Sequence, residues 1–289
     1  IAGRGEQPIK FNGSLFTMPV LRDFPEYNLS AGEEADFRLW GPLYFWQNTR
    51  LIYWTMFQSG DFDLMKPVFE MYFNMLPLMR ARTRLHFNHA GAISPEVNPW
   101  YGADFAVKPS TERSHSTFYY QSGLEIAAMM LDYWNATEDE TFLQSIAIPF
   151  SNEILIGYWE HYRKDENGKL YMEPAQALET YWDVVNPTPD IAGLKYLTDK
   201  LLDLNVQYGT KKDRLFWQQI RNATPEIPTR IVDGVEIISP AERIIDPIRH
   251  NWECPELYAI FPYRQFGLGL EGLELARHHG FDRVAPPLL

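Results

Sequence analysis

The sequence has very little cysteine and no excess of positive charge. Cys254 is the single cysteine among 289 residues, which excludes an internal disulfide framework. The formal net charge is −12, and no run of Lys or Arg is longer than a pair. Because nucleic-acid binding needs a basic surface that neutralises phosphates, we expect no nucleic-acid partner.

Long apolar runs are also missing. None approaches the roughly 20 residues that a transmembrane helix requires, so no membrane span is expected. No signal peptide is recognisable, and the chain begins with Ile1 rather than Met. We therefore expect a processed protein or a fragment of a longer one.

Patterns for metals and cofactors are weak. His86 and His89 lie three residues apart, but no second cluster of suitable spacing accompanies them, so no metal site is predicted. Gly267, Gly269 and Gly272 satisfy GxGxxG, but no strand precedes them, and we expect them to allow close helix packing instead. The sequence predicts no cofactor.

Aromatic residues, in contrast, are plentiful. Nine Trp, sixteen Tyr and eighteen Phe make up 15% of the chain. Such residues fill large helical cores, and their faces also stack on the apolar faces of sugars. A large core, a sugar-binding cleft, or both would account for them.

Two glutamates stand in an aromatic stretch that lacks helical periodicity. Glu173 and Glu179 lie among Tyr171, Tyr181 and Trp182, after a turn predicted at residues 167–168. This stretch is expected to be extended or looping, and such segments often carry catalytic or binding groups. An ordinary acidic surface loop is the alternative.

A helix is expected to follow at once. Thr188 can cap it, Pro189 suits its first position, and Asp190 lies favourably at the positive end of the helix dipole. Apolar residues then recur at helical spacing and predict one buried stripe: Ile191, Leu194, Leu197, Leu201 and Leu204.

A second stretch with possible chemistry covers residues 36–60. It becomes helical after Pro42 and ends at Gly60 as a C-cap. One helical face is formed by Trp46, Arg50, Tyr53 and Trp54, while Gln47 and Asn48 interrupt an apolar turn. Buried amides need partners, which are either structural or a substrate.

A third stretch, residues 85–113, lacks regular structure. A long aromatic and polar loop in a compact domain is often functional, and Glu96 and Trp100 are candidates for the wall of a cleft. We expect this stretch and the second one to line the same cavity as Glu179.

The remaining helices are predicted at residues 61–84, 118–134, 137–162 and 213–222. Thr137 and Glu140 form a capping-box pattern for the third of these. A hairpin is expected around Asp233 and Gly234, within an otherwise irregular segment at residues 223–250. A last helix is expected to carry Leu268, Leu273 and Leu275.

The run LETYWDVVNPTPDIAGLKYL resembles a segment of clan L glycoside hydrolases, chiefly family 65, the inverting disaccharide phosphorylases and hydrolases. In that family a glutamate followed by an aromatic loop, an asparagine and a helix is the general acid. Glu179, with Asn186 seven residues on, matches this spacing. An alignment to family 95, the inverting α-L-fucosidases and α-L-galactosidases, makes Glu173 the acid instead, although the Ser-Pro-Glu motif of that family is absent.

Two further stretches carry the resemblance. Aligning Tyr53 and Trp54 with family 95 places Asn48 on an asparagine that positions the attacking water, whereas Trp46 replaces a second asparagine. The run HNWECPELYAIFPY resembles a loop of the clan that ends in an aromatic-Pro step. The resemblance implies substrate-binding roles for a set of residues: Trp46, Gln47, Arg50, Glu96, Trp100, Trp182, Asn251, Trp252 and Glu253.

The resemblance implies an all-α fold, an (α/α)6 toroid with minor β hairpins, covering residues 36–289 after an irregular lead-in at residues 1–35. A complete toroid has twelve helices, so an incomplete one is expected here. The implied activity is that of an inverting glycoside hydrolase, α-L-fucosidase-like or galactosidase-like, secreted or periplasmic. The alternatives are an inverting disaccharide phosphorylase and a carbohydrate-binding toroid without catalysis. The motif of the family 95 catalytic base is missing, which leaves Glu253 and Glu256 as the candidate bases.

Overall fold

The computed structural model describes residues 8–9, 23, 30, 43–99, 102 and 112–280. The chain forms two compact units. The first comprises residues 1–75 and 96–107, and the second comprises residues 76–95 and 108–289. The boundary expected at residue 36 lies outside the described residues, so the expected division into a lead-in and one domain stays a prediction.

The first unit contains a short antiparallel sheet and a helix. Strand β1 (Leu43–Phe45) pairs with β2 (Val97–Pro99), and Tyr44 lies opposite Asn98. Helix α1 (Trp46–Ser59) follows β1 directly and ends at Gly60, whose φ of 74° is the left-handed conformation expected of a C-cap glycine. The expected helix and its end are thus confirmed.

Helix α2 (Phe62–Phe87) begins in the first unit and continues into the second. It confirms the helix expected at residues 61–84. Apolar residues of α1 and of the start of α2 are buried in the first unit, including Trp46, Tyr53, Met65, Phe69 and Tyr72, and the rings of Trp46 and Tyr72 are in contact.

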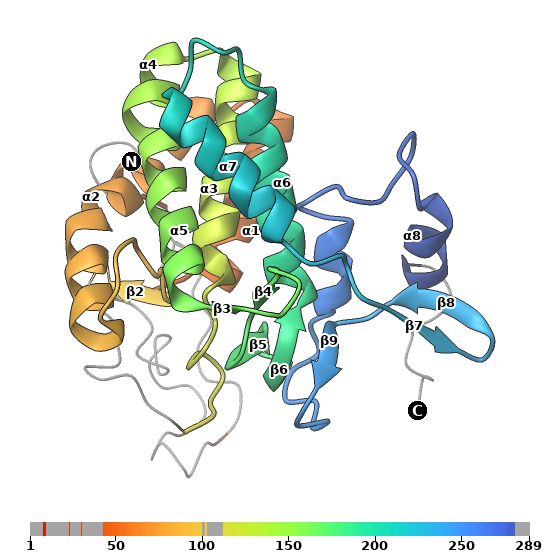
Figure 1. Ribbon diagram of the computed structural model, residues 1–289. Coiled ribbons are helices and arrows are strands. Elements are labelled where there is room, and N and C mark those ends of the chain that lie inside the picture. The colour runs from red at the N-terminus through yellow and green to blue at the C-terminus, as the bar shows by residue number, and fades with distance from the viewer. Residues whose placement is uncertain are drawn as a thin grey trace. The chain divides into compact units, whose positions relative to one another are not determined.

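The second unit is mainly helical. Its helices are α3 (Gln121–Thr137), the short α4 (Glu140–Phe142), α5 (Ile148–His161), α6 (Thr188–Asp203) and α7 (Lys211–Ala223). A π-helical turn, Leu143–Ala147, joins α4 to α5. Helices α3, α5 and α6 pack against one another, and α7 lies across α5 and α6 (Figure 1).

The capping box expected at Thr137 is wrong. Asp139 caps α4 through the backbone N–H of Phe142, at 3.0 Å. Thr137 instead ends α3, where its hydroxyl donates to the carbonyl of Tyr133. The start of the following helix is therefore two residues later than the pattern indicated.

Helix α6 confirms the predicted stripe, because all five apolar residues are buried. Polar residues outside this stripe are buried too, namely Asp190, Lys195 and Thr198, while Lys200 and Asp203 near the end of the helix are exposed. Thr188 is not the cap but the first helical residue. Its hydroxyl donates a hydrogen bond of 2.5 Å to the carbonyl of Ser239. A partner 51 residues away thus replaces the local hydrogen bond that the sequence indicated.

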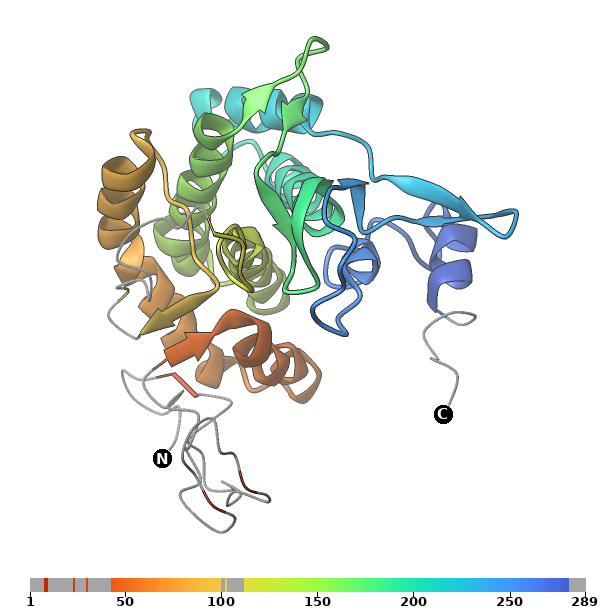
Figure 2. The ribbon, with the colours of Figure 1, turned by 90° about the horizontal axis from the view of Figure 1, so that it is seen from below.

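Three small antiparallel sheets accompany these helices. Strand β6 (Tyr181–Pro187) lies between β5 (Ala175–Ala177) and β9 (Ala241–Ile244), as Figure 2 shows, and leads directly into α6. The expected turn at residues 167–168 joins β3 (Arg163–Lys164) to β4 (Leu170–Tyr171). Strand β9 was not expected, because residues 223–250 were predicted to be irregular apart from one hairpin.

That hairpin is confirmed. Strands β7 (Thr229–Val232) and β8 (Val235–Ile238) pair antiparallel. Asp233 and Gly234 have φ values of 52° and 79° at the turn between them. Positive φ at both central residues is typical of a two-residue type I′ hairpin.

The C-terminal part differs from the expectation. A 3₁₀ helix, Pro255–Ala259, packs on α6, and α8 (Leu273–Gly280) follows a run of turns. Leu268 lies in those turns, 91% exposed, rather than in a helix. Gly269 has open space around it, and a side chain at Gly267 would meet one atom, at 4.0 Å. Only Gly272 is closely approached, by the ring of Phe266 in the same run of turns, so close packing between helices is not the role of these glycines.

The described chain is therefore mainly helical with small antiparallel sheets. Within the described residues, no helix is long and apolar enough to cross a membrane. The (α/α)6 toroid stays a prediction.

Candidate functional site

Glu179 lies at the tip of the β5–β6 hairpin in the second unit. The residue before it, Leu178, has a φ of 54° and is buried. Gln176 supports this tip: its amide nitrogen donates to the carbonyls of Leu178 (2.8 Å) and His115 (2.7 Å). Its side-chain oxygen accepts from the backbone N–H of Phe118, at 2.7 Å. One buried amide thus ties the tip to the segment at residues 112–118, and Glu179 itself remains half-buried.

Three side chains that the sequence singled out contact Glu179. Asn251 donates from Nδ2 to Oε2 of Glu179 at 2.8 Å. The indole N–H of Trp182 donates to the carbonyl of Glu179 at 2.8 Å. The backbone N–H of Glu179 lies 3.4 Å from Oε2 of Glu253. The hairpin tip and residues 249–253, here named the 249–253 loop, therefore form one cluster.

The 249–253 loop is fastened to the hairpin at several points. The backbone N–H of His250 donates to the carbonyl of Thr180 at 2.9 Å, and the Thr180 hydroxyl donates to the carbonyl of Glu253 at 3.0 Å. The rings of His250 and Trp182 stack with centroids 3.6 Å apart and planes within 7°. Trp252, next to Asn251, is 81% exposed.

The pKa of Glu179 is raised above its ordinary value. Burial is the main cause, because it penalises the charged carboxylate, while nearby His115 and the hydrogen bond from Asn251 partly oppose it. A carboxyl group that holds its proton to a higher pH suits the role of a general acid.

Glu173, the alternative acid, has a different environment. It is exposed, and its carboxylate lies 3.5 Å from Nη2 of Arg243. Arg243 also donates to the hydroxyl of Tyr171 at 3.1 Å. Glu173 thus takes part in a surface ion pair between the lead into β5 and strand β9.

The predicted residues of the first unit surround the start of α1. Trp46 is fully buried and meets the ring of Tyr72 edge-on, with centroids 5.5 Å apart. Glu96 is also buried, and its Oε1 accepts from the backbone N–H of Gln47 at 2.8 Å. A carboxylate in this place accepts from an N–H of the first helical turn that has no partner within the helix. It also interacts favourably with the positive end of the helix dipole.

The other two residues on this helix are half-buried. These residues are Asn48 and Arg50. The Nε of Arg50 donates to the backbone carbonyl of Gln47 at 2.9 Å. Trp100 lies outside the described residues. These residues belong to the first unit and Glu179 to the second, so a shared cavity stays a prediction.

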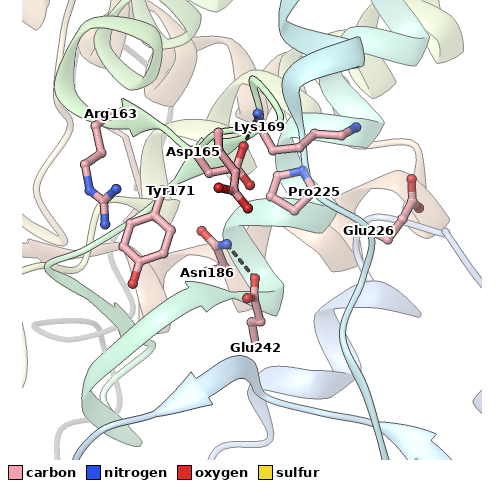
Figure 3. Close-up of a pocket in the computed structure, with 9 residues that line it drawn as sticks. Arg163, Asp165, Lys169, Tyr171, Asn186, Pro225, Glu226 and Glu242 are labelled. Carbon is pink, nitrogen blue, oxygen red and sulfur yellow. Dashed lines mark hydrogen bonds between the residues drawn. The ribbon is translucent and has the colours of Figure 1, made fainter.

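A separate cavity in the second unit has a volume of about 510 Å³. It lies between the β3–β4 hairpin, the end of β6 and the segment after α7 (Figure 3). Asn186 lines this cavity. Its amide nitrogen donates to a carboxylate oxygen of Glu242 at 2.6 Å, and its amide oxygen accepts from the backbone N–H of Met172 at 2.7 Å. Asn186, whose spacing from Glu179 supported the resemblance, thus links β6 to β9 and to the chain after β4.

Sequence reasoning missed Gln176, Thr180 and His115. Their contacts join residues that are 61 and 73 positions apart, and no local pattern marks such pairs. Among the described residues, no group of three or more His, Cys, Asp or Glu side chains is arranged to hold a metal ion.

Comparisons with known proteins do not identify a family for this chain. No family model matches the chain, and no curated protein matches it. Among solved structures it is similar to a candidate kojibiose phosphorylase from human microbiome, with a TM-score of 0.44 and 18% sequence identity. That match covers 57% of this chain and 25% of the other, so this chain spans about a quarter of that protein. A likeness at this score supports no conclusion about fold or function.

Proposed function

We propose that this chain is an inverting glycoside hydrolase of the clan L type, with an (α/α)6 toroid and with Glu179 as its general acid. The observation that carries the proposal is the half-buried carboxyl of Glu179 at a hairpin tip, hydrogen-bonded by Asn251 beside the stacked rings of Trp182 and His250. The motif resemblance around Glu179 supports the same assignment.

The chemistry needs two carboxyl groups. Glu179 protonates the glycosidic oxygen as the C–O bond breaks, and a second carboxylate removes a proton from the water that attacks the opposite face of the sugar. Trp252, which is exposed beside Asn251, offers an aromatic face on which a sugar ring can stack. The proposed substrate is an oligosaccharide or glycan with an α-L-fucosyl-like or galactosyl-like residue.

A disaccharide phosphorylase is the second candidate. There, phosphate replaces water, so the site must attract an anion. Arg113 and His115 place basic groups on the segment that Gln176 ties to the hairpin tip, although Arg113 also pairs with Asp183 at 3.0 Å. A carbohydrate-binding protein without catalysis is the third, because the same aromatic and acidic side chains can hold a sugar.

The test is an assay on aryl α-L-fucosides and galactosides, with and without inorganic phosphate, of the wild-type chain, Glu179→Gln and the exposed control Glu271→Gln. Loss of a general acid lowers turnover by about 10²–10⁴-fold. The loss should be large for a poor leaving group and small for an activated one, which leaves without a proton. Free sugar of inverted configuration supports the hydrolase, and a sugar phosphate supports the phosphorylase. Saturable sugar binding without turnover supports the binding protein. Equal turnover of the substrate with the poor leaving group by wild type and Glu179→Gln contradicts the role of Glu179.

A further inference from the structure

The side-chain amide of Asn251 has a defined direction. Its Oδ1 accepts from the backbone N–H of Trp252 at 2.6 Å, so the nitrogen must point the other way. That nitrogen donates to Oε2 of Glu179 at 2.8 Å. Both ends of the amide are therefore engaged, one within its own loop and the other with the carboxyl group.

This contact makes the two oxygens of Glu179 unequal. Oε2 accepts an N–H hydrogen bond, and the hydroxyl oxygen of a carboxylic acid is a weaker acceptor than its carbonyl oxygen, so this hydrogen bond favours Oε2 as the unprotonated oxygen. The acid proton is therefore more stable on Oε1. We propose, on the basis of the function proposed above, that Asn251 is a positioning residue which holds Glu179 so that Oε1 carries the proton delivered to the glycosidic oxygen.

Asn251 is itself held in place by its neighbours. The ring of His250 stacks on Trp182, and the backbone N–H of His250 donates to the carbonyl of Thr180. Trp182 in turn donates to the carbonyl of Glu179. These contacts join the 249–253 loop to the hairpin tip on both sides of Glu179, so the Asn251–Glu179 hydrogen bond does not rest on a single link.

Removing the amide donor has a predictable electrostatic effect. Burial favours the neutral carboxyl group of Glu179, whereas the Asn251 hydrogen bond favours the carboxylate. Without Asn251 only the opposing effect of His115 remains, and the pKa of Glu179 should rise further. The carboxyl group also gains freedom to rotate, which lowers kcat more than it changes KM.

The direct measurement is a ¹³C NMR titration of a chain labelled at glutamate carboxyl carbons, in which Glu179→Gln identifies the Glu179 signal. Asn251→Ala is compared with wild type and with Asn135→Ala, an exposed asparagine on α3. The indole ¹H–¹⁵N signal of Trp182 reports whether the hairpin tip keeps its structure. Asn251→Asp provides a second variant that keeps the Oδ1 acceptor for Trp252 but loses the donor.

The inference predicts that the Glu179 signal titrates at higher pH in Asn251→Ala and in Asn251→Asp than in wild type or Asn135→Ala. In the active chain, kcat falls on the order of 10- to 100-fold, and the alkaline limb of the pH–rate profile moves to higher pH. Unchanged titration in both Asn251 variants would overturn the inference. If titration shifts but Glu179→Gln leaves turnover intact, the proposed function fails and the Asn251 contact stands. If Glu179→Gln abolishes turnover while Asn251→Ala changes neither kcat nor titration, only the positioning role fails.

Discussion

The hydroxyl of Tyr158 donates to Oδ1 of Asp190 at 2.6 Å, and both side chains are buried. This contact links helix α5 to the first turn of α6. Burial raises the pKa of Asp190 from 3.8 to about 7, although the hydrogen bond from Tyr158 acts in the opposite direction. The sequence position of Asp190 indicated only a favourable interaction with the helix dipole. The raised pKa shows a further role, because the protonation of Asp190 is coupled to folding.

Asp190 should make the protein less stable as the pH rises from about 4 to about 7. In this range the folded state binds a proton at Asp190 that the unfolded state does not bind. The free energy of unfolding therefore falls with increasing pH. Asp190→Asn keeps an oxygen acceptor for Tyr158 and removes the titration, so the variant should be more stable than wild type at pH 8.

Urea unfolding at pH 5, 6, 7 and 8, followed by tryptophan fluorescence, measures this difference. The control is Asp203→Asn, an exposed residue at the end of the same helix. Parallel stability curves for wild type and Asp190→Asn would show that Asp190 is ionised in the fold.

His161 should have the opposite effect. Its Nδ1 lies 2.9 Å from Nε2 of His89, and its ring meets those of Phe87 and Tyr120 edge-on. Burial, assisted by His89, lowers the pKa of His161 to about 4. Between about pH 6.5 and pH 4 the unfolded state binds the extra proton, so the free energy of unfolding falls as the pH falls.

His161→Phe keeps the edge-on ring contacts and removes the titration, so the acid decline in stability should become shallower. Thermal unfolding between pH 4.5 and 7 tests this, with His278→Gln as the control, at a histidine whose side chain is 41% exposed. If the stability of His161→Phe falls with decreasing pH as steeply as that of wild type, the loss of stability in acid is caused by other groups.

Local patterns predicted much of the helical structure, because they depend on interactions within a few residues. The stripe of α6, the Gly60 cap and the turn at Asp233 and Gly234 all belong to this class. The predictions that failed involve partners distant in sequence. Thr188 bonds to Ser239 instead of capping its helix, and β9 exists because it pairs with β6.

The candidate site follows the same division. The resemblance singled out Glu179, Trp182, Asn251 and Glu253, and the structure brings these four together. The supporting roles of Gln176 and His115 depend on a contact across 61 residues, which no periodicity records. Trp46 was predicted to bind substrate yet is fully buried, since an aromatic residue in a helical stretch fits a core as well as a cleft.

The choice between the two glutamates can be tested directly. Glu173 is exposed and paired with Arg243, whereas Glu179 is half-buried with a raised pKa. Glu173→Gln should therefore leave kcat/KM within a few-fold of wild type, and Glu179→Gln should lower it by about 10²–10⁴-fold on unactivated substrates. The measurement is an initial-rate assay on matched aryl glycosides. The reverse order of effects would make Glu173 the acid.

Glu253 is the better placed of the two candidate bases. Its Oε2 lies 3.4 Å from the backbone N–H of Glu179, so its carboxylate reaches the hairpin tip. Glu256 is buried at the start of the 3₁₀ helix.

A base activates water whatever the leaving group is, so Glu253→Gln should lower turnover of activated and unactivated glycosides alike, by about 10²–10⁴-fold. Glu179→Gln should spare the activated substrate, and Glu256→Gln should change turnover only through stability. The amide oxygen in Glu253→Gln can still accept from the Glu179 N–H, and the indole signal of Trp182 checks that the tip keeps its structure. Wild-type rates for Glu253→Gln on both substrates would exclude Glu253 as the base.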